Sequence, residues 1–277
     1  MTVRPLVSTM TGMRAERVTD QVSYHGEGPV WWPRWQKLRF VDMFAGDVLT
    51  LVGDRVERTP VGSPIAAALR PRMGGGAIVA RERDLAISNL DDLSDLAGFI
   101  SLPEGVDMRC NDGGCDPDGA FWIGTIAYSF DAEAGSLYRL DAASRSPRRV
   151  LDRLTISNGI GWSPDTSTMY LNDSGTGITW AFDSDPIEGL SNRRVFAEPA
   201  DDDLPDGLCV DAEGGVFVND NPVAVSDATP FGQRWAGWYV TGRHGSQVHL
   251  GNRTATTVQQ FHEAGRALGN LDTVAGL

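Results

Sequence analysis

The sequence predicts an all-β fold, a β-propeller of repeated four-stranded blades, and three observations support this prediction. A polar residue, a turn and an aromatic-apolar run occur in this order at residues 109–126, and the same order returns at 158–171 and 206–218. The copies follow one another at intervals of about 40 to 50 residues, as four-stranded propeller blades do. Glycine, at 32 residues, and proline, at 15, separate many short apolar runs, which is typical of short strands.

The polar residue of each copy stands at a constant place in the repeat. It lies six residues before the second position of the turn, and a looser copy near the start of the chain keeps the same separation. The residues at this position are Glu27, Asn111, Asn158 and Asp206. Because equivalent residues of successive blades surround the propeller axis, we expect these four side chains to converge at one end of the central channel.

Taken in order, the chain offers further elements of the same kind. Residues 14–22 could form a strand, and residues 38–51 predict the two strands of a hairpin. The interval between the first two motifs requires one more copy, for which 75–89 is the candidate. Residues 90–107 are rich in aspartate and favour a solvated acidic loop.

The second half of the chain starts regularly and then changes. Residues 135–141 and 178–183 alternate as strands, and each ends in an aspartate that favours a turn. After about residue 219 the repeat does not continue in recognisable form. Residues 258–268 carry apolar side chains at helical separations and predict a short amphipathic helix.

Composition limits the class of partner and the compartment. A formal charge of −13 and a pI near 4.7 argue against nucleic acid and against an anionic membrane, since both require a basic surface. The three cysteines, Cys110, Cys115 and Cys209, favour reduced thiols over disulfides. With no apolar span long enough for a membrane helix, we expect a soluble cytoplasmic protein.

The four polar residues favour a site for a hard divalent cation. They offer only oxygen ligands, which suit calcium, magnesium or manganese, while the two carboxylates also allow zinc. Two alternatives remain open. Asn and Asp side chains often cap strand ends, and the Asn158-Gly159 and Asp206-Gly207 dipeptides are also hairpin signals.

Other catalytic patterns are weaker. The chain has no G-x-S-x-G elbow, which disfavours serine-hydrolase chemistry. The glycines at 74–76 lack a following helix and predict a tight turn rather than a dinucleotide site. His25, two residues before Glu27, shares its strand face and is expected either at the rim of the site or without a role.

Four ordered segments resemble the signatures of the gluconolactonase/regucalcin-like family of six-bladed β-propellers. They are GEGPVW at 26–31, RCNDG at 109–113, SNGIGWS at 157–163 and PDGLCVD at 205–211. The resemblance implies a single propeller domain over residues 1–277 with six four-stranded blades, of which the last is atypical or incomplete. Residues 14–218 are similar to the family's blades, and residues 219–277 form a divergent tail.

The same resemblance implies a site and a reaction. Glu27, Asn158 and Asp206 would bind one divalent metal ion, Arg109 and Asn111 would contact substrate, and Asp206 would also act as the base. The implied activity is metal-dependent hydrolysis of sugar lactones through an activated water, with a small lactone as the partner. The alternative is a non-catalytic calcium-binding propeller similar to regucalcin. Some members carry an acidic substrate contact in the segment that corresponds to residues 127–129, where this chain has no carboxylate.

Overall fold

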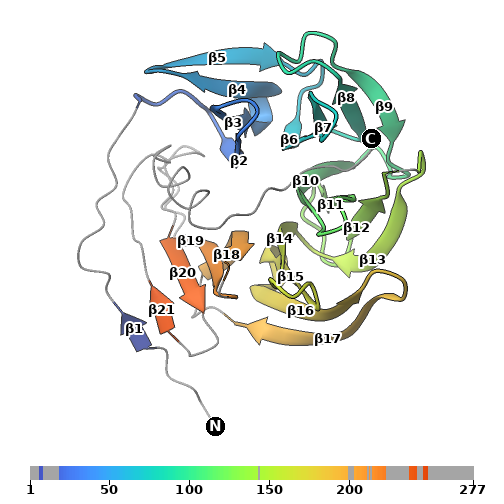
Figure 1. Cartoon of the computed structure of the whole chain (residues 1–277). Helices are drawn as coiled ribbons and strands as arrows, with labels where there is room; N and C mark the ends of the chain where they lie inside the picture. Colours follow the sequence, from blue (N-terminus) through green and yellow to red (C-terminus); the bar gives the residue numbers. More distant parts are fainter. Residues whose placement is uncertain are drawn as a thin grey trace.

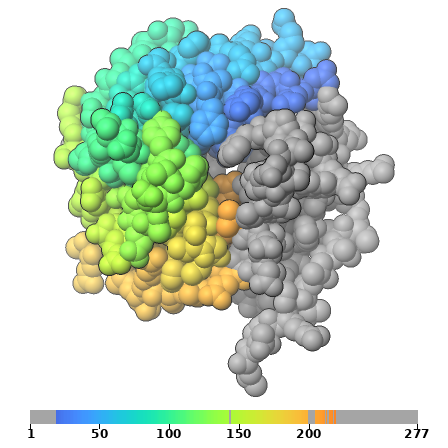
Figure 2. All heavy atoms as spheres, turned by 180° about the vertical axis from the view of Figure 1, so that it is seen from behind, coloured from blue at the N-terminus to red at the C-terminus, as the bar shows by residue number. Residues whose placement is uncertain are grey.

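The structure is a computed structural model of the chain, and it describes residues 6–8, 19–142, 144–198, 203–210, 212, 214–222, 237–241 and 246–248. Within the described residues, five antiparallel sheets surround a common axis (Figure 1). Figure 2, seen from behind, shows the segments of the first four sheets following one another in an arc. The predicted all-β propeller with an atypical or incomplete last blade is confirmed, and five of the six predicted blades lie within the described residues.

Each blade is a meander whose first strand lies nearest the axis (Figure 1). The first blade consists of β2 (Gly26–Trp32), β3 (Lys37–Asp42), β4 (Asp47–Val52) and β5 (Arg55–Pro60). The second consists of β6 (Ala66–Pro71), β7 (Ala77–Arg81), β8 (Asp84–Ser88) and β9 (Ala97–Ser101). The third consists of β10 (Met108–Cys115), β11 (Phe121–Ala127), β12 (Gly135–Leu140) and β13 (Arg148–Leu154). The fourth consists of β14 (Ser157–Trp162), β15 (Thr168–Asp173), β16 (Ile178–Asp185) and β17 (Gly189–Ala197).

The remaining strands belong to two smaller sheets. Within the described residues the fifth blade has three strands, β18 (Asp203–Val210), β19 (Val216–Pro222) and β20 (Gly237–Thr241). A separate parallel pair joins β1 (Leu6–Ser8) to β21 (Ser246–Val248) and thus connects segments near the two ends of the chain. The described helices are two 3-10 turns, η1 (Met43–Ala45) and η2 (Ser174–Thr176). No helix in the described ranges has the length and apolar character needed to span a membrane.

The hydrophobic cores lie between successive blades, and the alternation of strand side chains explains why. In β11, Phe121 and Ile123 pack with side chains of the second blade, whereas Trp122 packs with side chains of the fourth blade. Successive residues of a strand point to opposite faces, so one buried strand contributes to two cores. The burial of every residue of β11 follows from this position.

The local sequence predictions are confirmed in part. The predicted copy at 75–89 forms β7 and β8, and the glycines at 74–76 lie in the turn between β6 and β7, as predicted. The acidic loop at 90–107 is wrong in part, because the half-exposed outer strand β9 lies within it. The possible strand at 14–22 is wrong for residues 19–22, which are not a strand, and residues 14–18 lie outside the described residues. The helix predicted near 258–268 also lies outside them.

Candidate functional site

The innermost strands carry the four candidate residues, each beside an irregularity in its hairpin. Glu27 lies in β2, Asn111 in β10, Asn158 in β14 and Asp206 in β18. In each of the five blades that the structure describes, the pairing of the first strand with the second shifts by one residue, which marks a β-bulge. In the second blade the bulge falls at Ala67, so this blade contributes no polar side chain at the equivalent place.

These positions exclude the hairpin alternative. Asn158-Gly159 and Asp206-Gly207 lie inside strands, whereas the turns that follow β14 and β18 begin after Trp162 and Val210. Both pairs lie where the strand register shifts, so they mark a bulge rather than a turn. A bulge turns a side chain away from the regular pleat, and bulges are common next to active sites.

Arg109 and Asn111 join the third blade to the fourth. Arg109 Nη1 donates to Asn111 Oδ1 at 2.9 Å, and Asn111 Nδ2 donates to the carbonyl oxygen of Ser157 at 3.0 Å. Both side chains are buried, with Arg109 6% and Asn111 7% exposed. Ser157 directly precedes Asn158, so this contact brings the two asparagines into one region.

Asn158 is linked in turn to the strand that carries Asp206. Its Nδ2 donates to Ser174 Oγ at 2.9 Å, and Ser174 Oγ donates to the carbonyl oxygen of Pro205 at 2.5 Å. A second bond runs from Asn172 Nδ2 to the carbonyl oxygen of Asp206 at 2.6 Å. The amide nitrogen of Asn158 is therefore engaged with Ser174, which directs its carbonyl oxygen away from that hydroxyl.

Glu27 reaches the group through the start of the first blade. His25 Nε2 and Glu27 Oε1 lie 3.3 Å apart, and the His25 ring lies 4.7 Å from the ring of Phe44. The guanidinium of Arg109 lies over the same Phe44 ring at 5.4 Å, and its Nη1 approaches the sulfur of Met43 at 3.5 Å. His25 lies directly before β2 and contacts Glu27, and its role at the rim of the site stays a prediction.

Burial and a nearby carboxylate shift the pKa of Arg109 in opposite directions. Burial is the largest effect and lowers the pKa of its guanidinium, and the Glu27 carboxylate offsets part of this decrease. An arginine stays protonated in proteins even so, since its ordinary pKa is far above neutrality. The site therefore contains a buried positive charge within electrostatic range of the Glu27 carboxylate.

A phenol and a carboxylate form part of the same rim, and the sequence reasoning missed the carboxylate. Tyr128 Oη donates to Glu82 Oε1 at 2.6 Å, and burial together with this bond raises the pKa of Tyr128 to about 12. Glu82 comes from the turn between β7 and β8, and its carbonyl oxygen accepts from the backbone of Cys110 at 2.7 Å. No repeat motif marks Glu82, so only the packing of the second blade on the third could identify it.

The residues present suit a hard divalent cation. Glu27 is about one-third exposed, Asp206 is 8% exposed, and Asn158 adds a neutral carbonyl oxygen to these two carboxylates. This mixture of charged and neutral oxygen donors is typical of calcium and magnesium sites. No group of three or more His, Cys, Asp or Glu side chains suited to a metal occurs in the part of the chain that the structure describes. The candidate set differs from such a group because an asparagine is one of its three members.

Comparison with known proteins points to one family. A family model described as "SMP-30/Gluconolactonase/LRE-like region" matches residues 25–258, which continues past Val218. Regucalcin of Bos taurus is 32% identical over 218 residues, which cover 76% of this chain and 72% of that protein.

Two solved structures share the fold. A protein described as a calcium-binding regucalcin from Agrobacterium tumefaciens aligns with a TM-score of 0.73 at 21% identity and covers 90% of this chain and 79% of that chain. A gluconolactonase from Xanthomonas campestris aligns with a TM-score of 0.67 at 22% identity and covers 87% of this chain and 80% of that chain. At these identities the two structures support the propeller fold alone.

Proposed function

Because the chain belongs to the SMP-30/gluconolactonase/LRE-like family, we propose that it is a metal-dependent lactonase that opens sugar lactones or related cyclic esters. The observation that carries the proposal is the buried guanidinium of Arg109 among the oxygen donors of the inner strands. A site that only binds cations gains nothing from a fixed positive charge. A polyhydroxylated or anionic substrate, by contrast, gains a multidentate donor from it.

Glu27, Asn158 and Asp206 would hold one divalent ion, with calcium, zinc, magnesium and manganese as the candidates. Bound there, the ion would supply a Lewis acid for an ester carbonyl and lower the pKa of a bound water. The mixed donor set supports this assignment, as do the bonds that connect Asn158 through Ser174 to the strand of Asp206.

The chain's own residues would divide the remaining work. Asp206 would accept the proton of the attacking water, and that proton would pass to the alkoxide released when the ring ester bond breaks. The product is an open-chain hydroxy acid. Arg109 and Asn111 would orient the lactone, since Asn111 is itself held in place at both ends of its amide. Tyr128 and Glu82, beside Arg109, would meet the substrate's hydroxyl groups where some relatives use an acidic residue.

The proposed partner is a small lactone in the cytoplasm. We propose that the protein binds neither nucleic acid nor a membrane. The acidic net charge of −13 supports the absence of polyanionic partners. Three free cysteines, of which Cys110 and Cys115 are buried, support a reducing compartment.

A calcium-binding propeller without catalysis is the second candidate. It is favoured by the donor set and by the description of the Agrobacterium tumefaciens protein as calcium-binding. The difference between the two candidates is turnover rather than metal affinity.

A lactone panel tests the proposal. Gluconolactone and other aldonolactones would be followed by proton release, with spontaneous hydrolysis subtracted. We expect turnover that disappears after EDTA treatment and returns when one of the four metals is added. A folded, metal-loaded protein that turns over no lactone of the panel would contradict the lactonase and favour the calcium-binding alternative.

A further inference from the structure

Two buried aspartates hold the chain at the entrance of two site strands in the same way. Asp42 ends β3 and Asp173 ends β15, and both side chains are fully buried. Asp42 Oδ1 accepts from the backbone N–H of His25 at 2.9 Å, and Asp173 Oδ1 accepts from that of Ile156 at 2.9 Å. His25 and Ile156 each lie two residues before a proposed metal ligand, Glu27 and Asn158 respectively.

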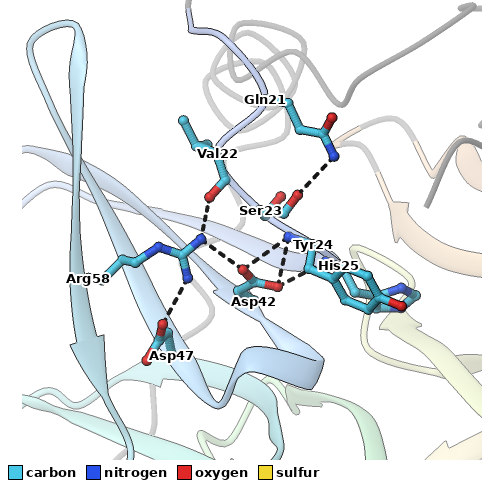
Figure 3. A network of polar contacts seen from close by, with 8 residues as sticks. All are labelled: Gln21, Val22, Ser23, Tyr24, His25, Asp42, Asp47 and Arg58. Atoms are coloured by element: carbon cyan, nitrogen blue, oxygen red, sulfur yellow. Dashed lines mark hydrogen bonds and ion pairs between the residues drawn. The ribbon is translucent and has the colours of Figure 1, made fainter. Parts of the chain in front are cut away.

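The same carboxylates accept a second backbone N–H each. Asp42 accepts from Tyr24 at 3.1 Å, as Figure 3 shows, and Asp173 accepts from Thr155 at 3.1 Å. Hydrogen bonds to an ionised carboxylate are roughly twice as strong as neutral ones. Each aspartate therefore fixes two consecutive peptide groups at the place where the chain enters the inner strand.

The turn after each aspartate completes the arrangement. The N–H of Met43 in η1 donates to the carbonyl oxygen of His25 at 2.8 Å, and the N–H of Ser174 in η2 donates to that of Ile156 at 3.1 Å. The residue two places before each ligand is thus held at both its N–H and its C=O. We call each of these units, an aspartate with the turn that follows it, an entry clamp.

The clamps occur where the proposed metal ligands are. Across the hairpin, Gly26 pairs with Asp42 and Ser157 pairs with Asp173, and the next residue in each inner strand is Glu27 or Asn158. In the fifth blade, Asp220 occupies the same register position opposite Pro205, directly before Asp206.

The blades that supply no proposed ligand differ at this position. In the third blade Thr125 lies opposite Cys110, and in the second Arg81 lies opposite Ala66. An aspartate here is therefore not a general requirement of the blade.

We propose that Asp42 and Asp173 are positioning residues for the divalent-metal site, acting on Glu27 and Asn158 through the backbone of His25 and Ile156. The inference rests on the proposed metal site and goes beyond it in assigning this role. For Asp42 the effect has a second route, because the His25 side chain contacts Glu27 Oε1. An asparagine in either place can keep the Oδ1 acceptor, but it removes the negative charge from these bonds. It also places an NH2 group where Oδ2 accepts from Tyr24 and Arg58 in Asp42, or from Thr155 in Asp173.

Metal titration of the full chain tests the inference. Metal-free protein would be titrated by calorimetry with Ca²⁺ and, separately, with Zn²⁺. We expect Asp42→Asn and Asp173→Asn to bind the preferred ion about 10- to 100-fold more weakly than the unmodified protein, as residues that orient metal ligands do. Thermal unfolding without metal would show how much of the fold each variant retains.

Asp116 provides the matched control. It is also buried, its Oδ1 accepts from the backbone N–H of Ala120 at 2.8 Å, and its Oδ2 pairs with Arg139 Nε at 2.8 Å. It lies in the turn at the other end of β10. Asp116→Asn should therefore lower stability while leaving metal affinity within about twofold.

Arg58 allows the test to continue if Asp42→Asn does not fold. This half-exposed arginine pairs with Asp42 at 3.0 Å and with Asp47 at 2.8 Å, and Figure 3 shows both contacts. Arg58→Met should loosen the clamp and weaken metal binding about threefold. Asp47→Asn leaves the contact between Arg58 and Asp42 in place and should not weaken metal binding.

The outcomes separate this inference from the proposed function. An unmodified protein that binds no divalent ion would contradict the metal site itself. If the unmodified protein binds and the folded variants of Asp42, Asp173 and Arg58 bind equally well, the positioning role is wrong. Equal loss of affinity in Asp116→Asn would also overturn it, because any loss of stability would then have the same effect.

Discussion

Arg109 Nη1 and Asn111 Oδ1 lie 2.9 Å apart, so the carbonyl end of the asparagine amide already faces a cation. Its nitrogen end donates to the carbonyl oxygen of Ser157. An amide oxygen that accepts from a guanidinium is poorly placed to bind a divalent ion, because the two positive charges would share one oxygen. This pairing separates Asn111 from the other three polar residues of the inner strands and favours the substrate role for it.

Replacing Asn111 by alanine should therefore reduce lactone turnover while the metal stays bound. We expect kcat/KM to fall at least about tenfold, because Arg109 loses its partner and the substrate loses an oriented amide. Metal affinity measured by titration should stay within about twofold of the unmodified protein. A loss of metal affinity as large as that of a carboxylate variant would identify Asn111 as a ligand.

Replacing Glu27 by glutamine or Asp206 by asparagine should instead reduce metal affinity sharply. Each change removes one of the two negative charges of the proposed ligand set, and calcium-type affinity depends strongly on that number. We expect the dissociation constant for the metal to increase at least about tenfold in either variant. Glu133 is an exposed carboxylate that pairs with Arg153 on the third blade. Its variant Glu133→Gln is a suitable control and should leave the metal affinity unchanged.

Gly159 is a site where a single methyl group should disturb both stability and metal binding. A Cβ at this residue would lie 2.3 Å from the backbone nitrogen of Leu208 and 2.6 Å from the carbonyl oxygen of Asp206. Since the obstructing atoms are backbone, Gly159→Ala must push β14 and β18 apart, at a cost of about 1–3 kcal/mol in the free energy of unfolding. Gly105→Ala, whose Cβ would meet no heavy atom within 4 Å, is the control. Chemical denaturation of the two variants would measure the difference, and equal stability would contradict the close approach.

Acid should destabilise the protein partly through Asp95. The hydroxyl of Ser88, with the backbone N–H groups of Asn89 and Leu90, lowers the pKa of this carboxyl from 3.8 to about 2. A carboxyl with a lowered pKa in the folded state contributes stability that is present above its ordinary pKa and is lost as pH falls toward the lowered value. Between pH 4 and pH 2 the melting temperature of Asp95→Asn should therefore fall less than that of the unmodified protein. If the melting temperatures of the two proteins fall by the same amount over this range, Asp95 makes no such contribution.

Much of the fold could be predicted because it repeats. The polar position and the turn identified three blades directly and the first blade through a looser copy, and the interval between motifs located the copy that became β7 and β8. Strand β9 was missed because it is short, half-exposed and preceded by aspartates, and therefore lacks an apolar pattern. Its pairing with β8 gives it the strand conformation, and such pairing is not visible in local sequence.

The repeat also predicted which residues belong to the candidate site, but not the contacts that connect them. Position in the repeat selected Glu27, Asn158 and Asp206, whereas the links between them depend on residues that the sequence motif does not mark. Glu82 and Ser174 are two such residues, and each acts across a boundary between blades or strands. Contacts of this kind arise from tertiary packing, so a single sequence carries no signal for them.

Neighbouring blades share hydrophobic cores, and this sharing affects how the molecule unfolds. Because β11 places Phe121 in one core and Trp122 in the next, removing one blade exposes apolar surface on both of its neighbours. Nearest-neighbour coupling of this kind makes adjacent units lose their structure together rather than one at a time. Since the proposed ligands come from the first, fourth and fifth blades, an ion bound to all three would act against the separation of any of them. Metal should then raise the melting temperature of the entire ring, including the second and third blades, which supply none of its ligands.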